Sequence, residues 1–289
     1  MPPQPYQKLV IKAYAKVNLA LEVLGRRPDG YHEIASILQT IDLYDTLSFE
    51  PASELKLDCP PELASETNLV MRAARQLKQV SAYRQGAHIT LEKGIPVAGG
   101  LGGGSSDAAA ALHGLNRLWG LGLARERLAA IAAGLGSDVS FFVYGGTALA
   151  RGRGERISPL PPLAEHWLVL LHPNLPIPEG KTARLYSRLN PTHFSEGEAT
   201  VRLFASLSSE LDISLLYNVF EKVAFDFFPG LSDYRQRFLE AGAPSVHLAG
   251  SGPTLFTMLK QKEPAAEICR RLEAQGLEAY LAGTVSQRG

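Results

Sequence analysis

The chain has 289 residues with 29 basic and 29 acidic side chains, so its formal net charge is zero. With 45% hydrophobic and 20% charged residues, it can bury the core of one large domain or two ordinary ones. The balanced charge gives no electrostatic support for nucleic-acid binding, which usually depends on a basic excess. Only Cys59 and Cys269 are present, which excludes a disulfide framework, and no apolar run approaches the length of a membrane span. Because the N-terminus also lacks a basic-then-apolar signal, we expect a cytoplasmic protein.

The first half of the chain alternates between strand and helix patterns. Alternating apolar residues predict strands, and apolar residues at helical spacing predict helices. The predicted strands cover residues 9–14, 19–24, 33–38, 46–50 and 87–92. The predicted helices cover a segment from Thr67–Asn68 to Val80, a segment that ends near Gly120, and residues 125–133. Residues 141–144 and 147–151 predict a hairpin through Gly145–Gly146.

A stiff proline-rich stretch at residues 158–162 separates this half from the second. Beyond it, apolar patterns predict strands over residues 166–172, 246–248, 255–259 and 279–284. Helices are predicted over residues 182–189, 215–228 and 263–275. Helix and strand interleave throughout, without a fixed repeat, so the patterns predict an α+β or mixed fold.

The most informative segment runs from Pro96 to Leu112, where five glycines fall within residues 99–104. Glycine adopts conformations that other residues avoid, and it lets backbone N–H groups approach a ligand closely. Four alanines then start a helix, with Ser105 or Ser106 as the predicted N-cap. A helix N-terminus carries free N–H groups and partial positive charge, which suit a phosphate. A flexible linker is the alternative interpretation, but the run lies between a strand and a helix.

Two common phosphate loops are excluded by the spacing of this run. A Walker A loop needs a lysine, and none lies between Pro96 and Asn116. A dinucleotide fingerprint needs glycines at i, i+2 and i+5, and the last position falls on Ser105 or Asp107. Instead, Pro-x-x-x-Gly-Leu-Gly-Gly-Gly-Ser-Ser-x-Ala-Ala resembles the phosphate-binding motif of the GHMP kinases. The triple glycine resembles most closely the branch that acts on 4-diphosphocytidyl-2-C-methyl-D-erythritol.

The resemblance implies a two-domain GHMP kinase fold. A ribosomal-S5-like N-terminal domain would cover residues 1–158, and a ferredoxin-like C-terminal domain would cover residues 159–289. It implies ATP and Mg²⁺ as cofactors. The implied ATP-binding residues are Pro96, Val97, Ala98, Gly99, Gly100, Leu101, Gly102, Gly103, Gly104, Ser105 and Ser106.

Two further segments carry the implied catalytic residues. Gly136-Ser137-Asp138-Val139 is similar to the family stretch with the catalytic aspartate, and Ala15-Lys16-Val17-Asn18 is similar to the first kinase motif. The resemblance implies that Asp138 is a base, which would accept the proton of the substrate hydroxyl. It implies that Lys16 orients Asp138, lowers the pKa of that carboxyl and stabilises charge on the transferred phosphoryl group. Without the resemblance, Asp138 reads as a turn residue and Lys16 as a solvated side chain.

The implied substrate site uses aromatic and polar side chains. Asp29-Gly30-Tyr31-His32 resembles the family segment at the cytidine pocket, and residues 182–186 match a Thr-x-x-x-aromatic pattern. An aromatic face stacks on a base while polar neighbours bind its edge. A core tyrosine is the equal alternative for Tyr186. The implied substrate-binding residues are Asn18, Tyr31, His32, Thr182 and Tyr186. Residues 248–254 resemble the third family motif, with a tight turn as the alternative.

The resemblance therefore implies a small-molecule kinase that transfers the γ-phosphoryl group of ATP directly to the 2-hydroxyl of 4-diphosphocytidyl-2-C-methyl-D-erythritol. A second hypothesis is another GHMP kinase, which acts on mevalonate, homoserine or a sugar. A third is a non-catalytic nucleotide- or RNA-binding protein. We expect no nucleic-acid or membrane partner, no resident metal site in the chain itself, and a monomer or weak homodimer.

Overall fold

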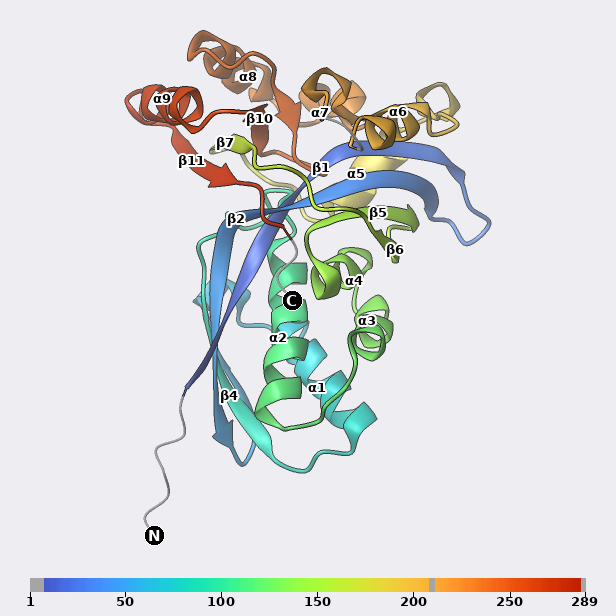
Figure 1. The fold of residues 1–289 in the computed structure, drawn as a ribbon, viewed down its shortest axis with the longest axis vertical. Coiled ribbons are helices and arrows are strands. Elements are labelled where there is room, and N and C mark those ends of the chain that lie inside the picture. Colours follow the sequence, from blue (N-terminus) through green and yellow to red (C-terminus); the bar gives the residue numbers. More distant parts are fainter. Residues whose placement is uncertain (1–7, 208–210, 287–289) are drawn as a thin grey trace. The chain divides into compact units, whose positions relative to one another are not determined.

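The computed structural model describes residues 8–207 and 211–286, which form two compact units that interleave along the chain. The first unit holds the described residues up to 15, with residues 44–97 and 102–144. The second holds residues 16–43, residues 98–101 and the described residues from 145 on. Two long strands, β1 (Leu9–Arg26) and β2 (His32–Ala52), contribute to both units (Figure 1). The predicted domain boundary between residues 158 and 159 stays a prediction.

The first unit packs helices on a twisted sheet. The end of β2 pairs antiparallel with β4 (Gly86–Glu92), which pairs parallel with β3 (Leu55–Asp58). The helices are α1 (Leu69–Ser81), α2 (Gly103–Leu118), α3 (Arg125–Ala133), α4 (Ser137–Tyr144) and a 3₁₀ turn at Pro61–Leu63. At Gly114 in α2, a Cβ atom would lie 2.4 Å from the Phe49 ring, so only glycine lets this helix lie so close to the sheet.

The second unit contains the rest of the long strands and a separate antiparallel sheet. Within it, β2 pairs with β5 (Thr147–Gly152), β5 with β6 (Arg156–Pro159), and β1 with β8 (Tyr217–Asn218). The separate sheet has the order β11-β7-β10-β9, from Glu278–Gly283, Trp167–His172, Leu255–Leu259 and His247–Leu248.

Five α-helices in the described residues accompany these strands in the second unit. They are α5 (Lys181–Arg188), α6 (Glu198–Ser206), α7 (Glu221–Phe227), α8 (Leu231–Glu240) and α9 (Lys262–Glu273), with 3₁₀ turns at Pro191–His193 and Ile213–Leu215. The apolar faces of α5, α7, α8 and α9 share one core with the separate sheet, in which Phe220, Phe228 and Phe238 are buried. The N-terminus of α6 is held by the buried carboxylate of Glu22, which accepts from Thr200 N at 2.7 Å.

Most predicted elements are present, and the α+β class is confirmed. Two pairs of predicted strands are in fact single strands, β1 and β2, because both faces of their central residues are buried and the alternation disappears. The predicted strand at 141–144 is wrong: it is the end of α4, since a short buried apolar run does not distinguish strand from helix. The predicted helix over 215–228 is shorter, because β8 takes residues 217–218. Helices α6 and α8 were not predicted.

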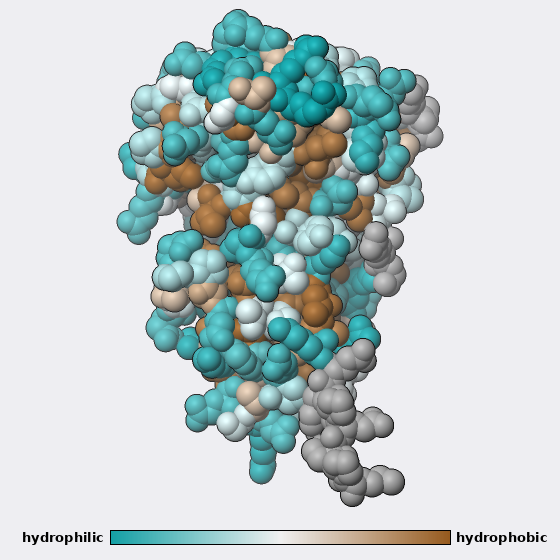
Figure 2. Space-filling view, turned by 90° about the vertical axis from the view of Figure 1, so that its left-hand side faces the viewer, coloured by the Kyte–Doolittle hydropathy of each residue, from teal (hydrophilic) through white to brown (hydrophobic). Residues whose placement is uncertain are grey.

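The visible face in Figure 2 is mostly hydrophilic, with separate apolar patches. The exposed large apolar side chains include Val201 on α6 and Val10 on β1, which are 63% and 55% exposed. Over the described part of the chain, we find no helix with the length and apolar character that a membrane span requires.

Candidate active site

In the first unit, the glycine run ends at the start of α2. Gly102 is the N-cap, with φ of 75°, and the helix begins at Gly103. The predicted N-cap at Ser105 or Ser106 is therefore wrong: the left-handed glycine starts the helix one turn earlier, and Ser106 N makes the first intrahelical bond, to Gly102 O. The N–H groups of the residues between them precede that bond and remain available to an anion.

The two serines of this first turn differ in environment. Ser106 is buried, and its hydroxyl donates to Tyr14 O at 2.6 Å, which ties the helix to β1. Ser105 is partly exposed in the first turn. Ser106 thus has a structural role, and its contact with a cofactor stays a prediction.

A buried charge cluster supports the same helix start. Asp45 accepts hydrogen bonds from Gly94 N at 2.7 Å and Ile95 N at 2.8 Å, and it forms an ion pair with Lys93. Lys93 Nζ also donates to Asp107 Oδ2 at 3.0 Å. Burial, above all, raises the pKa of Asp107 to about 8, and the Asp45 carboxylate adds to the rise while Lys93 opposes it. Sequence reasoning missed this cluster, because its members are separated along the chain.

Asp138 lies in the first turn of α4 and is half-buried. A carboxylate at this position interacts favourably with the positive end of the helix dipole. The predicted turn-residue alternative is therefore wrong for Asp138. The predicted role of Asp138 as the base in catalysis stays a prediction.

In the second unit, residues 98–101 of the glycine run contact the loop at residues 249–254. Thr254 N donates to Gly99 O at 3.2 Å, and a Cβ at Gly100 would lie 2.1 Å from Ala249 O. Gly100 also has φ of 88°, which favours glycine. The predicted second backbone loop is thus in contact with the glycine run.

The loop at residues 249–254 is held from several sides. Asn218 Nδ2 donates to Leu248 O and Gly250 O, each at 2.8 Å. His172 Nδ1 lies 3.0 Å from the Thr254 hydroxyl. Gly250 and Gly252 have positive φ values of 54° and 66°, so the backbone bends sharply here. Such a bend of successive peptide groups is typical of anion-binding concavities.

Lys16 lies on β1 beside this loop, and a Cβ at Gly250 would come within 2.9 Å of its Nζ atom. The ammonium donates to Asn18 Oδ1 at 2.7 Å, and Asn18 Nδ2 donates to the Ser36 hydroxyl at 2.8 Å. All three side chains are buried. Asn18 and Ser36 thus orient the Lys16 ammonium through two successive hydrogen bonds. Of these two residues, the sequence suggested only Asn18.

A second lysine that sequence reasoning missed contacts the same loop. Lys181 begins α5, is 9% exposed, and donates from Nζ to Gly252 O. The next residue, Thr182, lies with its hydroxyl 2.9 Å from the Ser251 hydroxyl. Burial, with a contribution from Lys16, lowers the pKa of Lys181 to about 7. Its position before the predicted Thr182 was the only available signal.

An aromatic cluster brings together two of the predicted substrate residues. The His32 ring stacks on Tyr186 with a centroid distance of 4.9 Å and an interplanar angle of 16°. Phe220 approaches Tyr186 edge-on at 4.8 Å, so Tyr186 serves both as core packing and as one wall of this cluster. Burial, and to a lesser degree Arg26, lowers the pKa of His32.

Tyr31 has a different environment from the His32–Tyr186 stack. Tyr31 is 56% exposed, and the Arg153 guanidinium lies 4.6 Å from the centroid of its ring. Arg153 comes from the turn between the paired strands β5 and β6. An exposed aromatic face of this kind can stack on a nucleobase.

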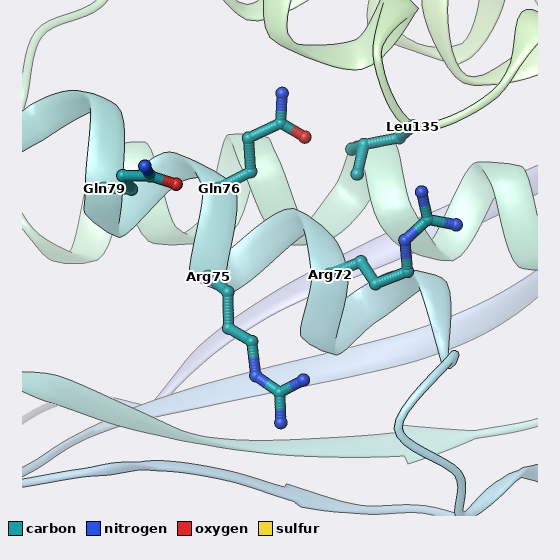
Figure 3. A pocket seen from close by; sticks show the side chains of 5 residues that line it. All are labelled: Arg72, Arg75, Gln76, Gln79 and Leu135. Carbon is teal, nitrogen blue, oxygen red and sulfur yellow. The ribbon is translucent and has the colours of Figure 1, made fainter.

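A separate open hollow of about 350 Å³ lies in the first unit (Figure 3). Four polar side chains of α1 line it, together with Leu135. In Figure 3 the Arg72 side chain reaches toward Leu135, whereas the Arg75 side chain points downward in this view. Arg75 pairs with Glu66 at 2.7 Å. No predicted site residue lines this hollow, so it is not the candidate site.

We find no group of three or more His, Cys, Asp or Glu side chains that could hold a metal ion in residues 8–207 and 211–286. Mg²⁺ commonly binds one or two protein groups and otherwise uses substrate phosphates and water. The Ser105 hydroxyl, partly exposed in the first turn of α2, is a donor that fits this mode. Mg²⁺ itself stays a prediction.

Comparisons with known proteins agree with this arrangement. Residues 68–146 match the family model of the GHMP kinases N terminal domain, and residues 199–278 match that of the GHMP kinases C terminal domain. A 4-diphosphocytidyl-2-C-methyl-D-erythritol kinase of Dehalococcoides mccartyi is 48% identical over 279 residues, which are 96% of this chain and 98% of that one. A kinase of the same name from Brevibacillus brevis is 40% identical over 92% of both chains.

Solved structures show the same likeness. The crystal structure of a 4-(cytidine 5'-diphospho)-2C-methyl-D-erythritol kinase has a TM-score of 0.80 and 35% identity, covering 97% of this chain and all of that one. A homoserine kinase from Cytophaga hutchinsonii has a TM-score of 0.76 at 18% identity, over 99% of this chain and 97% of that one. At that identity, the second likeness concerns the fold alone.

Proposed function

Because the chain belongs to the GHMP kinase family, in the group of 4-diphosphocytidyl-2-C-methyl-D-erythritol kinases, we propose that it phosphorylates the 2-hydroxyl of 4-diphosphocytidyl-2-C-methyl-D-erythritol with ATP. The observation that carries the proposal is 48% identity over nearly the full length to kinases of that name. The reaction belongs to isoprenoid precursor synthesis in the non-mevalonate pathway, and we place it in the cytoplasm. We expect the protein to act as a monomer or weak homodimer.

The residues proposed to hold ATP are those of the glycine run, Pro96 to Ser106. The first-turn N–H groups of α2 and its dipole suit the negative charge of the phosphates. Mg²⁺ would be held mainly by the phosphates, with the Ser105 hydroxyl as its protein donor. When bound, the ion would neutralise charge that develops on the phosphates.

Lys16 and Asp138 are the proposed catalytic residues. The substrate hydroxyl oxygen forms a bond to the γ-phosphorus while the bond from that phosphorus to the β–γ bridging oxygen breaks, and ADP leaves. Asp138 accepts the hydroxyl proton. Lys16, held by Asn18, stabilises the charge that develops on the transferred group. Transfer is direct, so no phosphorylated protein intermediate forms.

The aromatic cluster, together with the exposed Tyr31, is the proposed site for the cytidine end of the substrate. Tyr31 and Tyr186 present aromatic faces for the base, and His32 presents ring nitrogens to its edge. Thr182 and Asn18 provide polar groups for the rest of the substrate beyond the base. Two aromatic residues with a polar neighbour would favour a nucleotide-linked alcohol over a small free alcohol such as mevalonate or homoserine.

An ADP-coupled assay with a panel of alcohols tests the proposal. We expect turnover with 4-diphosphocytidyl-2-C-methyl-D-erythritol and no more than background with mevalonate, homoserine or galactose. CMP and CDP should compete with the alcohol substrate. Faster turnover with mevalonate or homoserine than with 4-diphosphocytidyl-2-C-methyl-D-erythritol would assign the chain to another GHMP kinase activity. No turnover with any alcohol would favour the hypothesis of a non-catalytic binding protein.

A further inference from the structure

Lys181 is a buried cation that the proposed reaction leaves without a role. It is 9% exposed, and its ammonium donates to Gly252 O in the loop at residues 249–254. The neighbouring Thr182 hydroxyl lies 2.9 Å from the Ser251 hydroxyl. Two consecutive residues of α5 thus contact two consecutive residues of the loop, and this fixes the ammonium against the bend at Gly250–Gly252.

The surroundings of Lys181 are unfavourable for a positive charge. Lys16 is a second cation close enough to interact with it electrostatically. Lys181 is also the first residue of α5, where the helix dipole is positive. Within the part of the chain that the structure describes, no carboxylate forms an ion pair with Lys181. A buried cation without a counter-ion is costly to fold, and a bound anion would offset that cost.

We propose that Lys181 is a second cationic binding residue, beside Lys16, for the polyphosphate group of a nucleotide that lies against the loop at residues 249–254. The proposal rests on the proposed function for the identity of the nucleotide, which is either ATP or the cytidine diphosphate part of the substrate. Lysine binds phosphate as a point charge, and the sharp bend at Gly250–Gly252 is typical of an anion-binding concavity.

Proton uptake provides a readout that a purely structural role would not produce. At pH 8 the Lys181 amine is mostly neutral, because burial lowers its pKa to about 7. A phosphate beside it favours the charged form, so binding should take up close to one proton. The other titratable groups around it are Lys16, whose ammonium donates to Asn18, and His172. The pKa of His172 is lowered mainly by burial and also by Lys181, while Glu278 raises it.

Isothermal titration calorimetry of the full chain at pH 8 tests the proposal, in Tris and in HEPES. CDP and ADP are titrated separately into the wild type, Lys181→Met, Lys181→Arg and the exposed control Lys222→Met. We expect wild type and Lys222→Met to take up nearly one proton with one nucleotide, and Lys181→Met to lose this uptake and bind that nucleotide about tenfold more weakly. Lys181→Arg should keep most of the affinity without uptake, because arginine stays charged. The nucleotide that responds identifies the source of the polyphosphate.

Unchanged affinity of Lys181→Met for both nucleotides would overturn the proposal. If that variant melts well below the wild type, the wild-type measurement decides: no proton uptake with either nucleotide overturns it as well. Turnover is measured in parallel. An active wild type with binding independent of Lys181 removes this inference alone, whereas an inactive wild type with Lys181-dependent binding removes the proposed activity alone.

Discussion

The ammonium of Lys16 donates a hydrogen bond to the amide oxygen of Asn18, with 2.7 Å between Nζ and Oδ1. These residues lie two apart on β1 and therefore point to the same face of the strand. Asn18 is fixed in turn by Ser36 on β2, whose hydroxyl donates to Ala20 O at 2.6 Å. Asn18 thus acts on Lys16, and its predicted contact with substrate stays a prediction.

Removal of the Ser36 hydroxyl should loosen this chain without touching the substrate. In Ser36→Ala, the Asn18 amide loses an acceptor inside the protein, which costs about 1–3 kcal/mol, and Lys16 loses its fixed orientation. We expect kcat to fall about tenfold with little change in the KM for ATP. Steady-state kinetics check this, with Ser187→Ala as a control on an exposed hydroxyl. A normal kcat in Ser36→Ala would show that Lys16 keeps its orientation without the Ser36 hydroxyl.

Asp138→Asn keeps the shape of the side chain and removes its basicity. We expect turnover to fall by about 10²–10⁴-fold, the usual contribution of a general base, while ATP still binds. The ADP-coupled assay gives the rate, and fluorescence titration with a labelled ATP analogue gives the affinity. Turnover at the wild-type rate would remove Asp138 as the base.

Gly100→Ala should disrupt the contact between the glycine run and the loop at residues 249–254. The new Cβ would lie 2.1 Å from Ala249 O, and alanine would have to adopt φ of 88°. We expect both a lower melting temperature and an activity below about 1% of wild type, because backbone strain and a steric clash act together. Gly25→Ala is the matched control, since its Cβ would meet nothing within 4 Å. An active, equally stable Gly100→Ala would contradict the close approach.

Tyr186→Ala should weaken binding of the cytidine substrate specifically. Stacking on an aromatic ring contributes about 1–3 kcal/mol per base, so the KM for the alcohol substrate should rise about 10–100-fold. The KM for ATP should remain within about twofold. Tyr186→Phe keeps the ring and serves as the control for packing against His32 and Phe220. If Tyr186→Ala raises the two KM values equally, the tyrosine supports only the core.

Asp107→Asn should make stability less dependent on pH. The pKa of Asp107 is raised to about 8 in the folded chain, mainly by burial, so the folded state holds a proton that the unfolded chain loses near its ordinary pKa. The free energy of unfolding that this proton contributes therefore falls as pH rises from the ordinary pKa of an aspartate to about 8, and then levels off. Asparagine removes this loss while it still accepts from Lys93.

The measurement is the melting temperature of both proteins from pH 5 to pH 9. We expect the advantage of Asp107→Asn to grow up to pH 8, to at least about 2–4 °C, the shift that 1 kcal/mol produces in a chain of this size. A constant difference across this range would show that Asp107 is ionised in the folded state throughout.

The family, and with it the kinase activity, followed from local sequence. The glycine run and the loop at residues 248–254 are continuous stretches that lie within the two matched GHMP kinase domains, so their resemblance is confirmed. The Ala-Lys-Val-Asn segment lies outside both matched domains. Helices α1, α3 and α9 were also predicted within one or two residues, because they are amphipathic or end at glycines.

Tertiary structure decided what depends on residues that are distant in the chain. Burial on both faces joined the predicted strand pairs into β1 and β2, and packing of an apolar run made α4 a helix. The Asp45–Lys93–Asp107 cluster and the contact of Lys181 with Gly252 join residues that lie 14 to 71 positions apart. A sequence records which side chains are present, but the pKa and the partners of a buried charge depend on desolvation and neighbours, which only folding supplies.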